Sequence, residues 1–179
     1  VVYNAVSNQY LADGIADIPD LLRAGVNVAV GPDGAASNNN LNMFNVIKSA
    51  VLLQRANTLD VLSLTAEQAL EMATINGAKA IGMEDKIGSL EPGKKADILI
   101  LNLNDYTMTP KMSCISNIVY SANCSAVDTV IVNGRTVLTE NHFTTVDEPA
   151  VYEEANKTLG RLISASGFQF KPCTWPVTE

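Results

Sequence analysis

The part of the sequence with the clearest chemical potential is a polar loop that follows an apolar run. Residues 26–30 (VNVAV) are suited to a buried strand, and the loop GPDG, which contains Asp33, follows directly. In parallel α/β folds, ligands bind at the carboxyl ends of strands, where a carboxylate can ligate a metal or act as a general base. The same pattern is also common turn chemistry, with Asp33 and Ser37 as turn and cap residues. The residues alone leave both interpretations open.

The sequence gives less support to a phosphate-binding loop, a histidine-rich metal site or a cysteine-based site. A phosphate-binding loop would need more than Gly31 and Gly34, because neither GxGxxG nor GK[ST] is present. The single histidine, His142, excludes a histidine-rich metal site built from this chain alone, and its position indicates a surface loop or an edge strand. The three cysteines contain no CxxC pair, so they predict neither a disulfide framework nor a thiolate zinc site.

The composition is that of a globular protein. The chain has 179 residues, a net charge of −7, 47% hydrophobic residues and 17% charged residues. Because no cluster of Lys or Arg is present, we expect neither a nucleic acid nor an anionic membrane as a partner. No apolar run reaches the roughly 18 residues of a membrane helix, and no signal peptide opens the chain. Together with the unpaired cysteines, this predicts a reducing, cytoplasmic location.

Residues 1–83 alternate between strands and helices. Two short apolar segments, 1–6 and 26–30, are expected to be parallel strands, because both faces are apolar and the connection is long enough for a right-handed crossover. The predicted helices cover residues 15–24, 41–56 and 66–81. Residues 38–40 (NNN) offer N-caps for the second helix, and Thr65-Ala-Glu-Gln is a capping box for the third.

From residue 84 onward the pattern becomes antiparallel β. Glu91-Pro-Gly-Lys places Pro and Gly at the central positions of a type II turn. Asn133-Gly134 between two apolar runs is a strong hairpin signal. The predicted strands cover residues 96–103, 115–120, 127–132 and 135–138. A last amphipathic helix is expected over residues 148–163, followed by an irregular tail from Ser164.

Several separated motifs together resemble the amidohydrolase superfamily. The branch is that of triazine-type chlorohydrolases and of deaminases of S-adenosylhomocysteine and methylthioadenosine. The first motif is GPDGAASNNNLNMF, preceded by VSNQYLADGIADIPDLLRAGVNVAV. The second is LTAEQALEMATINGAKAIGMEDKIGSLEPGKKADILILNL, which carries the family signature G-x-L/I-x-x-G-x-x-A-D-hydrophobic. VDTVIVNGRTVL is similar to the family's closing hairpin, and the resemblance extends over roughly residues 1–163.

The resemblance implies an α/β fold: the last strands and helices of a (β/α)8 TIM barrel plus the carboxyl-terminal part of a small β-sandwich domain. It assigns residues 1–83 to the barrel, 84–146 to the composite β-sandwich and 147–179 to a terminal helix and tail. Two strands cannot close a barrel and would leave apolar edges exposed. We therefore expect this chain to be a carboxyl-terminal portion, completed by an upstream segment of the same protein or by a partner chain. The oligomeric state is a separate question that the sequence leaves open, and a homodimer would be compatible with it.

The resemblance also implies roles for individual residues. Asp33 matches an aspartate that ligates the metal and handles a proton of the attacking water, so it is the expected catalytic and metal-binding residue. Ser37 matches a serine that lines the substrate site. Tyr3 stands where the family usually has a histidine, and we assign it to substrate binding. Two further departures are Ala5 in place of a proline and Pro32 in place of a threonine.

The metal implied by the family is a divalent ion, with zinc favoured and iron or manganese as alternatives. Most of its ligands must lie outside this chain, because the family's HxH pair and its middle-strand histidines have no counterpart here. Asn8 and Asn39 match motif positions that are expected to brace loops by hydrogen bonds.

The resemblance implies a metal-dependent hydrolase that acts on C–N or C–Cl bonds of a small heterocyclic substrate. Within that class we favour hydrolytic deamination of a purine nucleoside-like compound, once the upstream part of the barrel is supplied. The alternative is a catalytically inactive relative that binds a small molecule or acts as an assembly subunit. A free-standing α/β domain ranks last, because the β-domain signature has little purpose without the rest of the fold.

Overall fold

The computed structural model describes residues 1–169, and Cys173 lies outside the described residues. The chain divides into two compact units, Val1–His142 and Phe143–Glu179. The predicted division into 1–83, 84–146 and 147–179 differs from these units and stays a prediction.

Two short parallel strands lie at the centre of the first unit. Strand β1 (Val2–Tyr3) pairs with β2 (Ala29–Val30), with Tyr3 opposite Val30. The parallel pair is therefore confirmed, although both strands are shorter than expected. Residues 5 and 6 were predicted as strand, but they begin helix α1 (Ala5–Leu11). An apolar run of six residues fits either a buried strand or a buried helix face, which explains the error.

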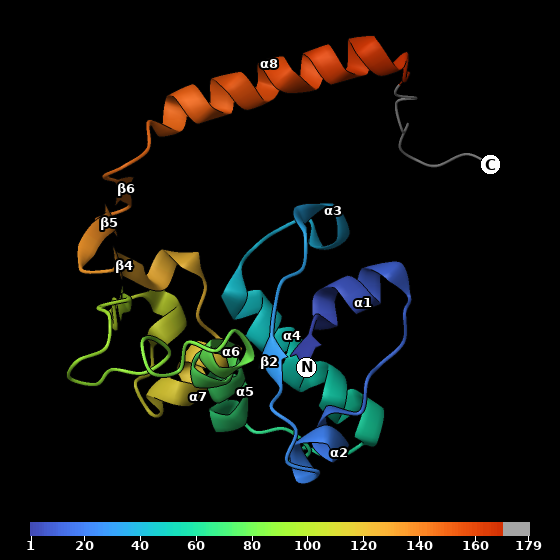
Figure 1. Cartoon of the computed structure of the whole chain (residues 1–179), viewed down its shortest axis with the longest axis vertical. Helices are drawn as coiled ribbons and strands as arrows, with labels where there is room; N and C mark the ends of the chain where they lie inside the picture. The colour runs from blue at the N-terminus through green and yellow to red at the C-terminus, as the bar shows by residue number, and fades with distance from the viewer. Residues whose placement is uncertain (170–179) are drawn as a thin grey trace. The chain divides into compact units, whose positions relative to one another are not determined.

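Helices flank this strand pair. Helix α2 (Ile18–Arg23) precedes β2, whereas α3 (Ala35–Asn38) and α4 (Met43–Thr58) follow it. The N-cap of α4 is Asn42, whose side chain accepts a hydrogen bond from the Phe44 N–H. The prediction of an N-cap among residues 38–40 is wrong, because the unexpected helix α3 uses this segment. Figure 1 shows α4 lying beside β2, and the two elements are in contact.

The capping box at Thr65 is confirmed, since Thr65 and Gln68 exchange both of its hydrogen bonds. The helix that follows is shorter than predicted. Helix α5 (Ala66–Ala73) ends at Thr74, where the backbone is non-helical (φ −125°, ψ −95°), and α6 (Ile75–Ala80) begins directly afterwards. The main core brings together buried side chains from β1, β2, α1, α2, α4, α5 and α7 and from the segments beside them, among them Tyr3, Ile18, Val28, Val46, Val51, Leu64, Met72 and Val119.

A four-stranded sheet forms the β part, in the order β3 (Ile98–Leu101), β4 (Val127–Val132), β5 (Arg135–Thr139) and β6 (His142–Phe143). The β4–β5 hairpin turns at Asn133-Gly134, where both residues have a positive φ as a type I′ turn requires. The type II turn is also supported, because Gly93 has φ +95° and the Lys94 N–H donates to the Glu91 carbonyl.

The predicted strand over residues 115–120 is wrong. This segment is helix α7 (Cys114–Tyr120), and its Ser113 side chain caps the helix by accepting from the Ser116 N–H. Its apolar residues Ile115, Ile118 and Val119 are spaced as one face of a helix. Two short 3-10 helices, η1 (Tyr106–Met108) and η2 (Cys124–Ala126), flank α7.

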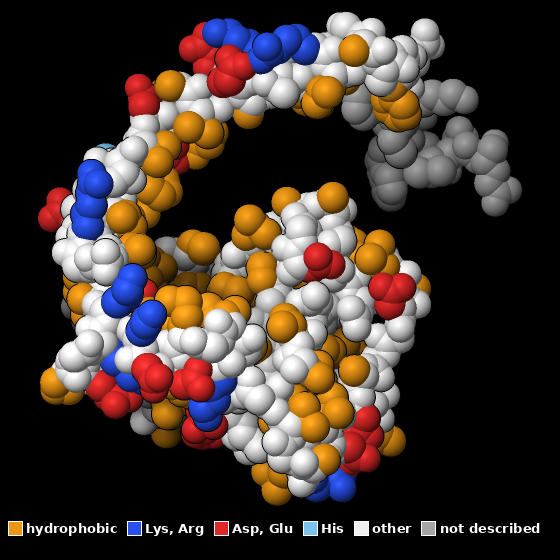
Figure 2. Space-filling model, viewed as in Figure 1, with side chains coloured by type: hydrophobic (Ala, Val, Ile, Leu, Met, Phe, Trp, Pro, Cys, Tyr) orange, Lys and Arg blue, Asp and Glu red, His pale blue; other side chains and the backbone are white. Residues whose placement is uncertain are grey.

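The second unit contains one long helix, α8 (Glu148–Ser166), which extends three residues beyond the predicted end. The helix has no buried residues, and its exposed apolar residues include Val151, Leu159 and Leu162. Both apolar and charged side chains are visible on its surface in Figure 2. Within residues 1–169, no helix has both the length and the apolar character needed to cross a membrane.

The observed architecture is a mixed α/β arrangement. In the described part of the chain, the parallel sheet has only two strands, so no barrel closes within it.

Replacing Gly88 by Ala is expected to destabilise the chain more than the same change at Gly93. Both glycines have a positive φ, +91° and +95°, which a side chain disfavours. Only at Gly88 would the added Cβ meet packed atoms, 2.7 Å from Ala78 Cβ and 3.0 Å from Ile75 Cα. We expect an extra loss of about 1–3 kcal/mol in the free energy of unfolding, measured by urea denaturation. Equal losses at both positions would contradict the packing role of Gly88.

Candidate active site

The candidate site begins where β2 ends beside the end of β1. The Gly31 N–H donates to the Tyr3 carbonyl at 3.2 Å, which continues the strand pairing by one residue. A Cβ at Gly31 would lie only 2.9 Å from Asn4 Oδ1 and 3.1 Å from Val2 Cγ1. Glycine therefore permits the two chain segments to approach closely at the carboxyl ends of both strands.

The loop that follows holds Asp33 in an unusual backbone conformation. Asp33 has φ +61°, in the left-handed region that non-glycine residues seldom adopt. The buried Asn38 of α3, which is 1% exposed, donates through Nδ2 to the Pro32 carbonyl at 2.7 Å and braces the loop. Aspartate adopts this region more readily than most residues, because its side chain can hydrogen-bond locally, here with the Gly34 N–H.

Two donors hold the Asp33 carboxylate, one at each oxygen. Ser7 Oγ in α1 donates to Oδ2 at 2.7 Å, and the Gly34 N–H donates to Oδ1 at 2.7 Å. The hydrogen bond from Ser7 and then that from Gly34, with a smaller contribution from the nearby Ser37 hydroxyl, hold the pKa of this exposed carboxyl below its ordinary value. Asp33 is thus an oriented, ionised carboxylate at neutral pH.

Ser37 lies in α3, close to Asp33. Its hydroxyl donates to the Gly34 carbonyl at 3.0 Å and also favours the ionised form of Asp33. The structure therefore brings together two of the three predicted site residues. Their roles in catalysis and substrate binding stay predictions.

Tyr3 lies in a different environment. Its side chain is 2% exposed, and its hydroxyl accepts a hydrogen bond from Gln54 Nε2 of α4 at 3.0 Å. Burial raises the pKa of the Tyr3 phenol, an effect that the bond from Gln54 partly offsets. The hydroxyl is thus engaged with α4 in the core. A substrate contact by Tyr3 stays a prediction.

The described residues contain no group of three or more His, Cys, Asp or Glu side chains that could hold a metal ion. Asp33 fits one ligand of such a site, since carboxylate oxygens bind divalent metals and its two donors leave lone pairs free. His142 lies in the exposed strand β6, with Nδ1 2.7 Å from the Glu140 carbonyl oxygen. Cys114 and Cys124 are exposed free thiols.

Sequence reasoning missed two residues of the site, Ser7 and Asn38. Both are small polar residues that the structure buries, and both bind the Asp33 loop from segments outside the GPDG turn. The residues expected to brace the loops, Asn8 and Asn39, are the neighbours of Ser7 and Asn38 in the same motifs. Asn39 caps the C-terminal end of α3, with φ +64°. No local pattern distinguished Ser7, because it follows the apolar run 1–6 and is itself followed by two polar residues, Asn8 and Gln9.

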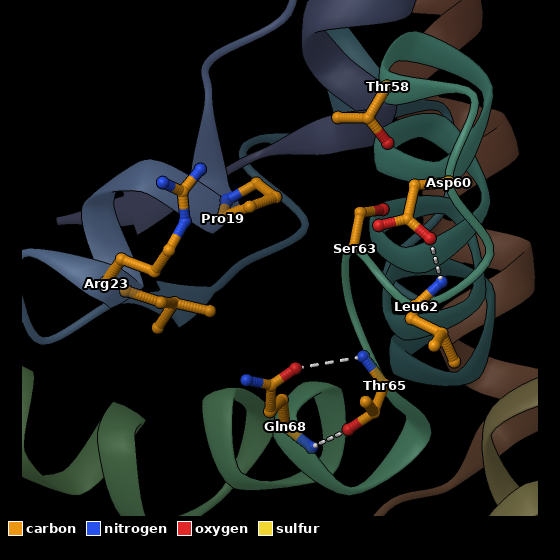
Figure 3. Close-up of a pocket in the computed structure, with 9 residues that line it drawn as sticks. Pro19, Arg23, Thr58, Asp60, Leu62, Ser63, Thr65 and Gln68 are labelled. Carbon is orange, nitrogen blue, oxygen red and sulfur yellow. Dashed lines mark hydrogen bonds between the residues drawn. The ribbon is translucent and has the colours of Figure 1, made fainter.

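The cavity in Figure 3, of about 540 Å³, contains none of the predicted site residues. Residues from α2, from the end of α4 and from the start of α5 line it. Its polar groups already serve local structure: Thr65 and Gln68 form the capping box, and Asp60 accepts from the Leu62 N–H. Arg23 pairs with Asp20 on its own helix. Ser63 is an exception, because its Oγ is buried without a hydrogen-bond partner although the residue also lines the cavity.

Comparison with known proteins gives a clear assignment. A family model described as the amidohydrolase family matches residues 1–137. The chain belongs to the amidohydrolase family. Within that family, its similarity is to the branch of methylthioadenosine and S-adenosylhomocysteine deaminases.

Two relatives illustrate this similarity. This amidohydrolase chain is 46% identical to a 5-methylthioadenosine/S-adenosylhomocysteine deaminase from Syntrophomonas wolfei, over 91% of this chain and 38% of that protein. It is 44% identical to a 5′-deoxyadenosine deaminase from Methanobrevibacter smithii, over 93% of this chain and 38% of that protein. The chain therefore spans a little over a third of the length of these relatives.

Solved structures agree on the fold. An adenosine deaminase from Xanthomonas campestris, crystallised with bound zinc, matches with a TM-score of 0.89 and 35% identity, over 92% of this chain and 37% of that one. A zinc complex of the atrazine chlorohydrolase from Arthrobacter aurescens matches with a TM-score of 0.81 and 24% identity, over 87% of this chain and 35% of that one. The second likeness supports the fold alone.

Replacing Tyr3 by Phe is expected to destabilise the amidohydrolase chain. Gln54 is fully buried, and its Nε2 donates to both the Tyr3 hydroxyl and the Ala16 carbonyl. Loss of the hydroxyl leaves one buried N–H without a partner, which costs about 1–3 kcal/mol in the free energy of unfolding. The exposed Tyr10 is the matched control, and Tyr10→Phe is expected to stay within about 0.5 kcal/mol of wild type. Equal effects of the two substitutions in thermal or urea unfolding would contradict this role.

Replacing Ser7 by Ala is expected to raise the pKa of Asp33 towards its ordinary value, because Ser7 is the main cause of its lowering. A carboxyl with a lowered pKa stabilises the folded chain above its unfolded-state pKa, and this contribution is lost as the pH falls through the folded-state pKa. The variant should therefore lose the contribution of Asp33 at a higher pH than wild type. NMR titration of the Asp33 side-chain carboxyl carbon measures the shift directly, and an unchanged titration would contradict the assigned cause.

Proposed function

We propose that this chain forms part of a metal-dependent amidohydrolase that deaminates an adenosine-like nucleoside by hydrolysis. The observation that carries the proposal is the Asp33 carboxylate, ionised, exposed and held by two donors at the end of β2. The deaminase names of the relatives support the substrate class. The rest of the barrel is supplied by further residues of the same polypeptide or by a second chain.

The proposed reaction replaces the exocyclic amino group of the base with an oxygen atom from water and releases ammonia. A divalent metal, with zinc favoured, would activate the water when bound. Asp33 would hold this metal together with ligands from outside the chain. As an ionised carboxylate, it would also accept a proton from the attacking water and pass it towards the departing nitrogen.

The other two predicted residues have supporting roles in this proposal. Ser37, which lies in α3 close to Asp33, would hydrogen-bond the nucleoside. Tyr3 would shape the end of β1, where the family usually has a histidine. Deamination is preferred to cleavage of a C–Cl bond, because the relatives with the higher sequence identity are named as deaminases, whereas the chlorohydrolase likeness concerns the fold.

Asp33→Asn is expected to lower kcat for deamination by about 10²–10⁴-fold, because the amide can neither accept the proton nor ligate as an anion. The assay is ammonia release from methylthioadenosine, S-adenosylhomocysteine and 5′-deoxyadenosine by the full-length protein loaded with zinc. The matched control is Asp128→Asn, since Asp128 is an exposed aspartate of β4 whose carboxylate also accepts from a hydroxyl, that of Thr129. Its activity should equal that of wild type.

Two results would contradict the proposal. Activity of Asp33→Asn equal to that of Asp128→Asn would remove Asp33 from the reaction. Absence of ammonia release by the zinc-loaded wild type would favour the inactive relative, which binds a small molecule or serves as an assembly subunit. The coding sequence upstream of Val1 offers an independent check, because an HxH pair is expected there if the rest of the barrel belongs to the same polypeptide.

A further inference from the structure

Ser7 is a buried serine whose hydroxyl faces the exposed Asp33 carboxylate. Ser7 is 2% exposed, and its Oγ lies 2.7 Å from Asp33 Oδ2. This is the length of a charge-assisted hydrogen bond from a hydroxyl to a carboxylate. The donor thus belongs to the packed body of the unit, whereas the acceptor faces solvent. Because packing fixes the Ser7 hydroxyl, its hydrogen bond can also fix the orientation of the Asp33 carboxylate. A mobile, exposed donor would not fix it in this way.

The position of Ser7 is set by the strand pair. A single residue, Asn4, joins β1 to α1, so Ser7 follows Tyr3 by only four residues. The first residue of α1, Ala5, is fully buried, and Gln9 Nε2 of the same helix donates to Ser49 Oγ of α4 at 2.7 Å. Because Tyr3 lies opposite Val30, the same register that places Ser7 also places Asp33, three residues beyond Val30.

The two donors bind different oxygens of the Asp33 carboxylate and come from different parts of the fold. The Gly34 N–H binds Oδ1 from within the loop, whereas Ser7 binds Oδ2 from a separate element. Gly34 moves with Asp33 because it is the next residue in the chain. Ser7 alone among these two donors fixes the carboxylate relative to β1. Each oxygen keeps a further lone-pair direction for another partner.

We infer that Ser7 is a positioning residue, which orients the free lone pairs of Asp33 towards the metal and the reacting water. The inference rests on the proposed function, and it adds a residue that the family motif analysis did not assign to the site. Ser7 itself touches neither the metal nor the substrate. A purely structural serine would instead satisfy only its own buried hydroxyl and would leave the site unchanged when removed.

Zinc affinity and steady-state kinetics of the full-length protein separate these two roles. Ser7→Ala is expected to weaken zinc binding, measured by competition with a chelator, and to lower kcat, each by about 10–100-fold. KM for the nucleoside is expected to stay unchanged, because Ser7 does not touch the substrate. Ser7→Thr keeps the hydroxyl and should recover most of both losses. Ser125→Ala is the matched control, because it removes a serine hydroxyl that donates to a different carboxylate, Asp105 Oδ2, at 2.9 Å, and it should leave both measurements at wild-type values.

A double-mutant cycle keeps the test decisive if threonine does not fit at position 7. In an Asp33→Ala background, Ser7→Ala should not weaken zinc binding further, because the hydroxyl then has no carboxylate to orient. An equally large effect of Ser7→Ala in both backgrounds would overturn the inference. The inference would also be overturned if Ser7→Ala had the zinc affinity and the kcat of wild type. In that case the proposed function would still stand, provided that the zinc-loaded wild-type protein is active. An inactive zinc-loaded wild type would overturn the proposed function and this inference together.

Discussion

Parallel pairing of β1 with β2 sets the geometry of the candidate site. Tyr3 lies opposite Val30, and both segments leave the sheet directly after this pair, one through Asn4 into α1 and the other through Gly31 into the Asp33 loop. Ser7 and Asp33 are 26 positions apart in the sequence, and this register brings them into hydrogen-bond contact. A shift by one residue would turn every side chain of these strands to the opposite face and separate the donor from the carboxylate.

Strand β1 also contributes to the core, through the buried side chain of Tyr3. Its hydroxyl and the Ala16 carbonyl share the two N–H groups of Gln54, which ties β1 to α4 and to the segment before α2. The next residue of α4, Arg55, donates to the Tyr120 hydroxyl of α7 and to the Leu64 carbonyl. Helix α4 therefore holds several elements through polar side chains.

Features with local causes could be predicted from the sequence. The Thr65 capping box and the Asn133-Gly134 turn depend on residues within four positions of one another, and the structure contains both. Helix α7 was mistaken for a strand, because a short segment rich in Ile and Val fits either element until its packing partners are known. The Ser7–Asp33 bond and the orientation of Tyr3 depend on contacts between distant segments, so local pattern could not reveal them. Two apolar side chains of β3, Leu99 and Ile100, are exposed, which suits the expectation that this sheet belongs to a larger composite β-sandwich.

The central claim is that the Asp33 carboxylate is one ligand of a metal whose other ligands come from outside this chain. The most direct test is a crystal structure of the zinc-loaded full-length protein, with the metal located by anomalous scattering. The account predicts zinc at about 2.0–2.2 Å from an Asp33 carboxylate oxygen, with Ser7 still bound to Oδ2. Zinc held at full occupancy by other residues, with Asp33 outside its coordination sphere, would contradict the account.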